Sequence, residues 1–152
     1  EDITDFGYVS RMDNFQAGIL NIRLKKLKKV IAQRRHNANL YFKLLKNVKE
    51  INLPYEERYQ FNTFHTFIIK AKNRDKLKKY LLKRKISTAI HYSKLIFDQK
   101  AYISKFKKIS TKEYLKSRNY VSNILTLPIN EFLSAKDIFL ISKEILKFYN
   151  YN

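Results

Sequence analysis

The residues His65–Tyr92, with the sequence HTFIIKAKNRDKLKKYLLKRKISTAIHY, decide the fold because they combine the patterns of a strand, a helix and a second strand. The apolar run within His65–Ala71 is too short for a helix and predicts a strand. Asn73 offers a side-chain oxygen that could cap a helix beginning at Arg74. The buried stripe of this helix is predicted to contain Leu77, Tyr80, Leu81 and Leu82, with lysines on the opposite face.

A second short β-rich run, Ile86–Ile90, follows this helix. We expect the chain to return across the sheet here and to place His91 and Tyr92 at the end of the strand. Loops at strand ends commonly carry binding groups in α/β proteins. An imidazole and a phenol hydroxyl suit hydrogen bonds to sugar hydroxyls or to a diphosphate. From the pattern alone, a structural role at the strand end remains the alternative.

A long helix is predicted before this unit, over residues of about 11–47. Ser10 and Asp13 form a pair similar to a capping box, which places the helix start near Arg11. About 35 residues would span roughly 50 Å, which is more than a small domain needs, so we expect the helix to connect two bodies or to bend near Arg34–His36. Its apolar positions recur every three to four residues, at Met12, Phe15, Ile19, Ile22, Leu27, Val30 or Ile31, Ala38, Tyr41, Leu45 and Val48.

The C-terminal part alternates loops with short elements. Ser93–Phe106 has scattered aromatic residues and no clear period, which is typical of a binding loop. Thr111–Ile124 is predicted to be helical and Leu125–Pro128 to be a short strand. Ser134 is predicted to cap the last helix, Ala135–Tyr149.

Composition limits the class of protein. The chain has 152 residues and no cysteine. Its length suits one domain with a core, and the absence of cysteine excludes disulfides and thiolate metal sites. No apolar run is long enough to span a bilayer, and the acidic start is unlike a signal peptide. We therefore expect a cytoplasmic protein with no membrane partner.

The formal net charge of +19 raises the alternative of a stand-alone module that binds nucleic acid. Lysines outnumber arginines by 24 to 8 and are spread over predicted helix faces, as in Lys25–Lys29 and Lys76–Lys83. We interpret them mainly as solvated faces and predict no nucleic-acid partner. Steep salt dependence of nucleic-acid binding would support the alternative.

Four segments carry a resemblance to a known family. Ile86–Tyr92 (ISTAIHY), Gln99–Tyr102 (QKAY) and Leu125–Ile129 (LTLPI) resemble the C-terminal part of the DegT/DnrJ/EryC1/StrS family. Gly7–Ala17 (GYVSRMDNFQA) is similar to that family's Gly-aromatic-Asn-x-Arg-x-x-x-x-Gln-Ala segment. The resemblance covers nearly the whole chain in the expected order. The family consists of aminotransferases that depend on pyridoxal phosphate and act on nucleotide-linked keto-sugars.

The resemblance implies an α+β (α/β) fold in which residues 1–152 form the single small C-terminal domain of a fold-type I pyridoxal-phosphate-dependent transferase. A short sheet would carry helices on one face, the long helix would connect to the rest of the enzyme, and the large cofactor-binding domain would lie outside this chain. The implied reaction converts a keto-sugar nucleotide to an amino-sugar nucleotide for polysaccharide or glycan biosynthesis, with glutamate as the expected amino donor and a homodimer as the expected assembly. A sugar dehydratase of the same family remains the alternative.

The resemblance also implies a substrate site. The family's His-Tyr-Pro segment lies at the nucleotide-sugar pocket, which implies substrate-binding roles for His91 and Tyr92. Ser93 stands where the family usually has proline, and Phe97 stands where a second histidine is common. These two departures leave the loop geometry and the choice of sugar open.

Ser10 and Arg11 are the expected cofactor-binding residues. An arginine beside the free amides of a helix N-terminus can form an anion site for a phosphate, and a glycine-relieved turn before an ordinary helix cap is the alternative. In the family, an asparagine of this loop reaches the cofactor phosphate of the neighbouring subunit, and here Val9 occupies its position. Arg11 and Gln16 match the family segment, so Arg11 is the best candidate for the contact.

The remaining candidates receive no site. His65 is predicted to be a satisfied core side chain and His36 to lie on a solvated helix face. No pair of His, Asp or Glu has metal-ligand spacing, so no metal is predicted. No lysine lies in a segment similar to the family's Schiff-base region, so we expect no catalytic residue in this chain and no catalysis by it alone. We also expect the apolar surface around Met12–Leu24 to be exposed or self-associated.

Overall fold

The computed structural model describes residues 2–9, 11–106 and 109–151. In this part of the chain, six α-helices and one short 3-10 helix accompany a three-stranded antiparallel sheet in the order β1-β2-β3. The α+β class is therefore as predicted. The elements are α1 Asn14–Leu24, α2 Leu27–Leu45, β1 Ile51–Asn52, β2 Phe67–Ala71, α3 Arg74–Lys83, η1 Ile96–Asp98, α4 Lys100–Lys105, α5 Leu115–Asn123, β3 Ile124–Leu127 and α6 Ala135–Phe148.

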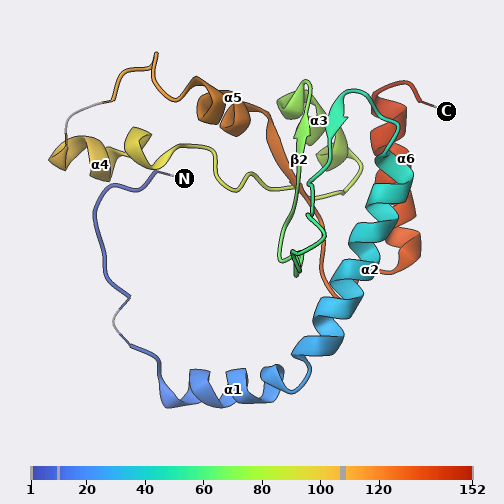
Figure 1. Cartoon of the computed structure of the whole chain (residues 1–152), viewed down its shortest axis with the longest axis horizontal. Coiled ribbons are helices and arrows are strands. Elements are labelled where there is room, and N and C mark those ends of the chain that lie inside the picture. The colour runs from blue at the N-terminus through green and yellow to red at the C-terminus, as the bar shows by residue number, and fades with distance from the viewer. Residues whose placement is uncertain (1, 10, 107–108, 152) are drawn as a thin grey trace.

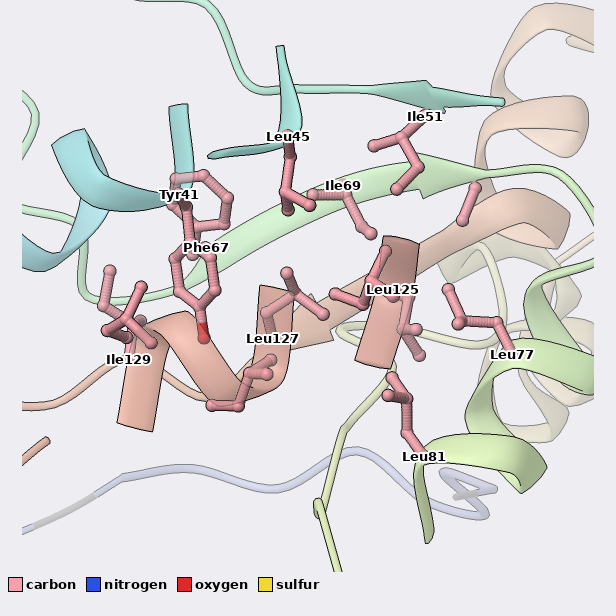
Figure 2. Close-up of a cluster of buried hydrophobic side chains, with 14 of the residues drawn as sticks. Tyr41, Leu45, Ile51, Phe67, Ile69, Leu77, Leu81, Leu125, Leu127 and Ile129 are labelled. Atoms are coloured by element: carbon pink, nitrogen blue, oxygen red, sulfur yellow. The ribbon is translucent and has the colours of Figure 1, made fainter. Parts of the chain in front are cut away.

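The core lies against one face of the sheet. Phe67 and Ile69 of β2 are fully buried, as expected for alternate residues that share a strand face. They pair across the ladder with Leu127 and Leu125 of β3, so all four side chains gather on the same side (Figure 2). Burial of each such side chain stabilises the fold by about 1.5–3 kcal/mol, which makes this pair of strands the centre of the domain.

Three helices cover this face. α2 lies beside α6 (Figure 1), and α3 packs on α6, on the central strand β2 and on the edge strand β3. The predicted sheet with helices on one face is confirmed. The fully or nearly fully buried apolar side chains that these helices contribute are Ala38, Tyr41, Leu45, Leu77, Leu81, Ile138, Ile141 and Ile145.

The prediction of one continuous helix over residues 11–47 is wrong. α1 ends at Leu24 and α2 begins at Leu27, so the chain turns at Lys25 and Lys26 and not near Arg34–His36. Lysine is a good helix former, so local propensity does not account for the break. The two helices differ in packing: α2 lies against α6, whereas no residue of α1 is buried. Tertiary contacts with α6 therefore set the direction of α2, whereas α1 has no buried residue that would hold it in line with α2.

The start of α1 also differs from the prediction. Asp13 is the N-cap, and its backbone N–H donates to Oε1 of Gln16 at 3.2 Å, so the capping pair lies three residues later than predicted. Ser10, the predicted cap, lies outside the described residues. The predicted exposure of the apolar surface around Met12–Leu24 is observed, since Phe15 is 79% exposed and Ile22 is 63% exposed.

Two details of the strand–helix–strand unit differ as well. Asn73 precedes α3 as predicted, but it adopts a left-handed conformation (φ 57°) and its side chain makes no cap hydrogen bond. Leu82 was predicted to be buried and is 63% exposed, because it lies one position beyond Leu81 on the helix surface. Ile86–Ile90 forms no strand; only Ala89 makes an isolated antiparallel bridge, to Thr126.

The C-terminal predictions hold more closely. β3 occupies the predicted strand, and Ser134 caps α6 by accepting from the backbone N–H of Asp137 at 3.2 Å. α5 begins at Leu115 instead of the predicted Thr111. The segment predicted as a binding loop, Ser93–Phe106, contains η1 and α4. Within the described ranges, none of the helices combines the length and the apolar composition that a membrane crossing requires.

Candidate functional site

His91 is positioned by β3. The backbone N–H of Thr126 donates to the carbonyl of Ala89 at 2.8 Å, and the N–H of Ala89 donates back to Thr126 at 3.1 Å. Two residues later, Nδ1 of His91 lies 2.9 Å from Oγ1 of Thr126. Because strand residues alternate, Thr126 lies on the sheet face opposite to Leu125 and Leu127. Backbone and side-chain bonds to one residue thus hold the imidazole, and its Nε2 remains available for a ligand.

Tyr92 lies next to His91 on the surface. Its side chain is 71% exposed, and its ring is nearly perpendicular to the imidazole, with 5.5 Å between the ring centroids. The structure therefore keeps the two predicted substrate-binding side chains together, each with a polar atom that a ligand can approach.

A hollow of about 950 Å³ extends from these two residues. The N-terminal segment closes one side of it, because the N–H of Ile3 donates to Oε1 of the buried Gln99 at 3.0 Å. The N–H of Ala101 in turn donates to the carbonyl of Ile3 at 2.9 Å. The lining residues are Ile3, Asp5, Phe6, Gly7, Lys78, Thr88, Ala89, Ile90, His91, Tyr92, Ser93, Lys94, Ile96, Gln99, Ala101 and Tyr102.

Two cations line this larger hollow. Lys78 belongs to α3, and Lys94 forms an ion pair with Asp2 of the N-terminal segment. The hydrogen bond from the Lys94 ammonium holds the pKa of the Asp2 carboxyl below its usual value. Cationic and aromatic side chains in one hollow suit a ligand that carries phosphate and a planar base.

A smaller hollow of about 290 Å³ lies beside it. Thr88, Ala89 and His91 line both hollows and form the wall that they share. The complete lining of the smaller hollow is His65, Thr66, Ser87, Thr88, Ala89, His91, Thr126, Leu127, Pro128 and Ile129.

His65 is exposed and lines this smaller hollow, so its prediction as a core residue is wrong. The neighbouring Phe64 is buried in its place, with 2% exposure. The guanidinium of Arg34 donates to the carbonyls of both residues, at 3.4 Å to Phe64 and 2.9 Å to His65. These bonds orient the entry to β2 so that Phe64 points into the core.

α2 holds the far side of the smaller hollow. The hydroxyl of Tyr41 donates to the carbonyl of Pro128 at 2.9 Å, and burial raises the pKa of this hydroxyl. The side-chain amide of Asn37 donates to the carbonyls of Asn130 and Leu133, each at 3.1 Å. These buried donors fix the turn after β3, which is part of the hollow's lining.

Of the two predicted cofactor-binding residues, only Arg11 is among the described residues, and it lies apart from these hollows. Arg11 lines neither of them, its side chain is 81% exposed, and its Nη2 lies 2.7 Å from the carboxylate of Asp13. Gly7 of the same segment does line the larger hollow. Ser10 lies outside the described residues.

Two residues that shape the site, one through His91 and one through the N-terminal segment, were not predicted. Thr126 and Gln99 both occur in the quoted segments LTLPI and QKAY, but they received no role. Strand alternation around Leu125 and Leu127 was the available signal for Thr126. Gln99 acts through a contact with Ile3, 96 positions away, which no local pattern indicates.

Pyridoxal phosphate requires a lysine amine and an acid that pairs with the pyridine nitrogen. No lysine is buried among residues 2–9, 11–106 and 109–151, and at the larger hollow Lys94 is already paired with Asp2. Lys78 also lines the larger hollow, together with the acidic residue Asp5. The same ranges contain no cluster of three or more His, Cys, Asp or Glu side chains that could hold a metal ion.

Comparisons with known proteins agree on one family. The sequence model of the DegT/DnrJ/EryC1/StrS aminotransferase family matches residues 1–145. A dTDP-3-amino-3,6-dideoxy-alpha-D-galactopyranose transaminase from Aneurinibacillus thermoaerophilus is 33% identical over 132 residues, which cover 87% of this chain and 35% of the relative. The erythromycin biosynthesis sensory transduction protein EryC1 of Saccharopolyspora erythraea is 29% identical over 130 residues, covering 86% of this chain and 35% of that protein.

Solved structures give the same result. DesV of S. venezuelae, crystallised with a ketimine intermediate, superposes with a TM-score of 0.87 at 25% identity, covering 96% of this chain and 39% of DesV. A DegT DnrJ EryC1 StrS aminotransferase from Brucella abortus superposes with a TM-score of 0.82 at 29% identity, covering 94% of this chain and 37% of that one. The chain thus spans about 35–39% of the length of the relatives described here.

Proposed function

Since this chain belongs to the DegT/DnrJ/EryC1/StrS aminotransferase family, we propose that it is the small, substrate-binding domain of an enzyme that converts a keto-sugar nucleotide to an amino-sugar nucleotide. The observation that carries the proposal is the family match over residues 1–145, nearly the full chain. The relative from A. thermoaerophilus is named a transaminase of a dTDP-linked sugar, which favours amino transfer over the dehydratase alternative.

In this proposal, His91 and Tyr92 bind the substrate. The hydrogen bond between His91 and Thr126 orients the imidazole before the ligand arrives, so less conformational freedom is lost on binding. Pyridoxal phosphate, when bound, would supply the electron sink for amino transfer, and Ser10 and Arg11 are the candidates in this chain for a contact with its phosphate. Arg11 is exposed and pairs with Asp13, so it would exchange this ion pair for an anion contact across a homodimer interface.

The test uses the full-length protein loaded with pyridoxal phosphate, a panel of nucleotide-linked keto-sugars and glutamate as the amino donor. Mass spectrometry of the products should detect an amino-sugar nucleotide. A product that has lost a hydroxyl without gaining nitrogen would identify a dehydratase. Turnover of no member of the panel, with glutamate or with another amino acid, would contradict the proposed activity.

A further inference from the structure

The two hollows at His91 differ in charge. Lys78, Lys94 and Asp5 line the larger hollow, where Lys94 is paired with Asp2, whereas no lysine, arginine, aspartate or glutamate is among the described residues that line the smaller one. The smaller hollow is instead lined by two imidazoles and by the hydroxyls of threonine and serine side chains. A phosphate group prefers cationic donors, so the larger hollow offers phosphate the better site.

The wall between the hollows contains an unsatisfied polar atom. Oγ1 of Thr88 is buried and has no hydrogen-bond partner among the described residues. Thr88 lines both hollows, together with His91, whose Nδ1 is already engaged by Thr126. Because a buried hydroxyl without a partner costs free energy, a ligand that supplies one would gain affinity here.

We propose that the smaller hollow binds the hydroxyl groups of the sugar in the nucleotide-sugar, with His65 as an additional contact, while the larger hollow holds the nucleoside diphosphate. This assignment rests on the proposed function. An imidazole and an alcohol each donate and accept hydrogen bonds, as sugar hydroxyls do. Both volumes, about 290 Å³ and about 950 Å³, are on the scale of pockets that bind small molecules.

His65 is suited to this role because its backbone is fixed while its side chain is exposed. Its carbonyl accepts from Nη1 of Arg34 at 2.9 Å, and Nη2 of Arg34 lies 3.1 Å from the carboxylate of Glu131. The hydrogen bond from Arg34 therefore holds the backbone of His65 in place, while its exposed imidazole lines the hollow. Substitution of this exposed side chain should leave the fold intact, which makes it suitable for a binding test.

The test compares two probes on the full-length protein by isothermal titration calorimetry: dTDP, and dTDP-glucose as a sugar-bearing probe that offers no keto group. UDP and UDP-N-acetylglucosamine form a second pair, since the base is not assigned. His65→Ala should weaken binding of the sugar-bearing probe roughly three- to tenfold, the effect of one lost hydrogen bond, and change the affinity for the free diphosphate less than twofold. His65→Asn, which keeps a donor and an acceptor, should recover part of the loss.

Two further variants complete the design. His36→Ala is the matched control, because His36 is also an exposed histidine and lines neither hollow, so neither probe should be affected. Lys78→Ala should weaken the binding of both the free diphosphate and the sugar-bearing probe, in whichever probe pair wild type binds. If His65→Ala binds the sugar-bearing probe as tightly as wild type does, the inference is wrong. The inference is also wrong if His65→Ala weakens binding of both probes equally. Either result leaves the proposed function standing. If wild type binds no probe of either pair, the proposed function fails and the inference fails with it.

Discussion

Nδ1 of His91 lies 2.9 Å from Oγ1 of Thr126, and the backbone of Thr126 also exchanges two hydrogen bonds with Ala89. One buried residue of β3 therefore sets both the path of the 89–92 segment and the orientation of the imidazole. The hydroxyl of Thr126 can donate to Nδ1 or accept from it, so this contact is compatible with either tautomer of the neutral imidazole. Thr126 is a positioning residue in this arrangement.

Thr126→Val should lower the affinity for nucleotide-sugar about two- to fivefold, because the imidazole loses its only side-chain partner in the described ranges while the backbone bridge remains. Thr126→Ser keeps the hydroxyl and serves as the control. The imidazole ¹⁵N chemical shifts of His91 provide the second measurement, since they report the tautomer. Identical chemical shifts and identical affinities in Thr126→Val and wild type would show that Thr126 does not position His91.

His91→Ala or Tyr92→Phe should weaken productive use of the keto-sugar nucleotide by roughly 1–3 kcal/mol in kcat/KM, which is the cost of losing a hydrogen bond to a polar or charged group. Absorbance titration of the full-length protein should show unchanged affinity for pyridoxal phosphate, because neither side chain is expected to touch the cofactor. If either variant loses affinity for pyridoxal phosphate while its kcat/KM for the keto-sugar nucleotide stays normal, these residues contact the cofactor and not the substrate.

Leu77 and Leu82 provide a matched pair on α3. Leu77 is fully buried, so Leu77→Ala should lower the free energy of unfolding by about 2–5 kcal/mol through lost burial and a residual cavity. Leu82 is 63% exposed, so Leu82→Ala should change the same quantity by less than about 0.5 kcal/mol. Urea unfolding followed by circular dichroism measures both. Equal effects of the two substitutions would contradict the observed packing of α3.

Glu56 ties the loop before β2 to α2. Its carboxylate lies 2.7 Å and 3.2 Å from the two terminal nitrogens of Arg35, and the hydrogen bond from Arg35 holds the pKa of Glu56 below its usual value of 4.5. A lowered pKa in the folded state means that the ionised carboxylate stabilises the fold above about pH 4.5. This contribution is lost as the pH falls through the lower folded-state pKa.

Glu56→Gln should therefore unfold at lower urea concentration than wild type at pH 7, and the difference should shrink and disappear on acidification below pH 4.5. Glu57→Gln is the control, since Arg35 pairs with Glu56 and not with its neighbour. A difference that stays constant from pH 7 to pH 3 would show that the ion pair does not stabilise the loop.

The exposed face of α1 leads to a prediction about association. Phe15 and Ile22 are 79% and 63% exposed, and no residue of α1 is buried. The double variant Phe15→Ser/Ile22→Ser should reduce self-association in sedimentation velocity and lower the fluorescence of a hydrophobic dye on the 152-residue chain. Its unfolding midpoint should stay unchanged. A compact monomer with no dye binding before substitution would contradict the prediction.

Elements whose patterns are local could be predicted from the sequence. β2, α3, β3 and the Ser134 cap of α6 were predicted within a few residues, because alternation, helical period and capping depend on neighbours along the chain. The adjacency of His91 and Tyr92 was likewise predictable. The site roles of these two residues, together with Ser10 and Arg11, remain predictions.

Only the tertiary structure decided the features that depend on distant segments. The turn between α1 and α2 could not be predicted, because the two lysines at the turn are good helix formers. The turn arises because α2 packs on α6, whereas no residue of α1 is buried. Ile86–Ile90 has the composition of a strand, yet it meets β3 only at Ala89. His65 lies on the surface because the neighbouring Phe64 occupies the core position. Thr126 belongs to the site because it contacts His91, 35 positions earlier in the chain. Hydrogen bonds and burial between segments far apart in the chain set these outcomes, and no local period encodes them.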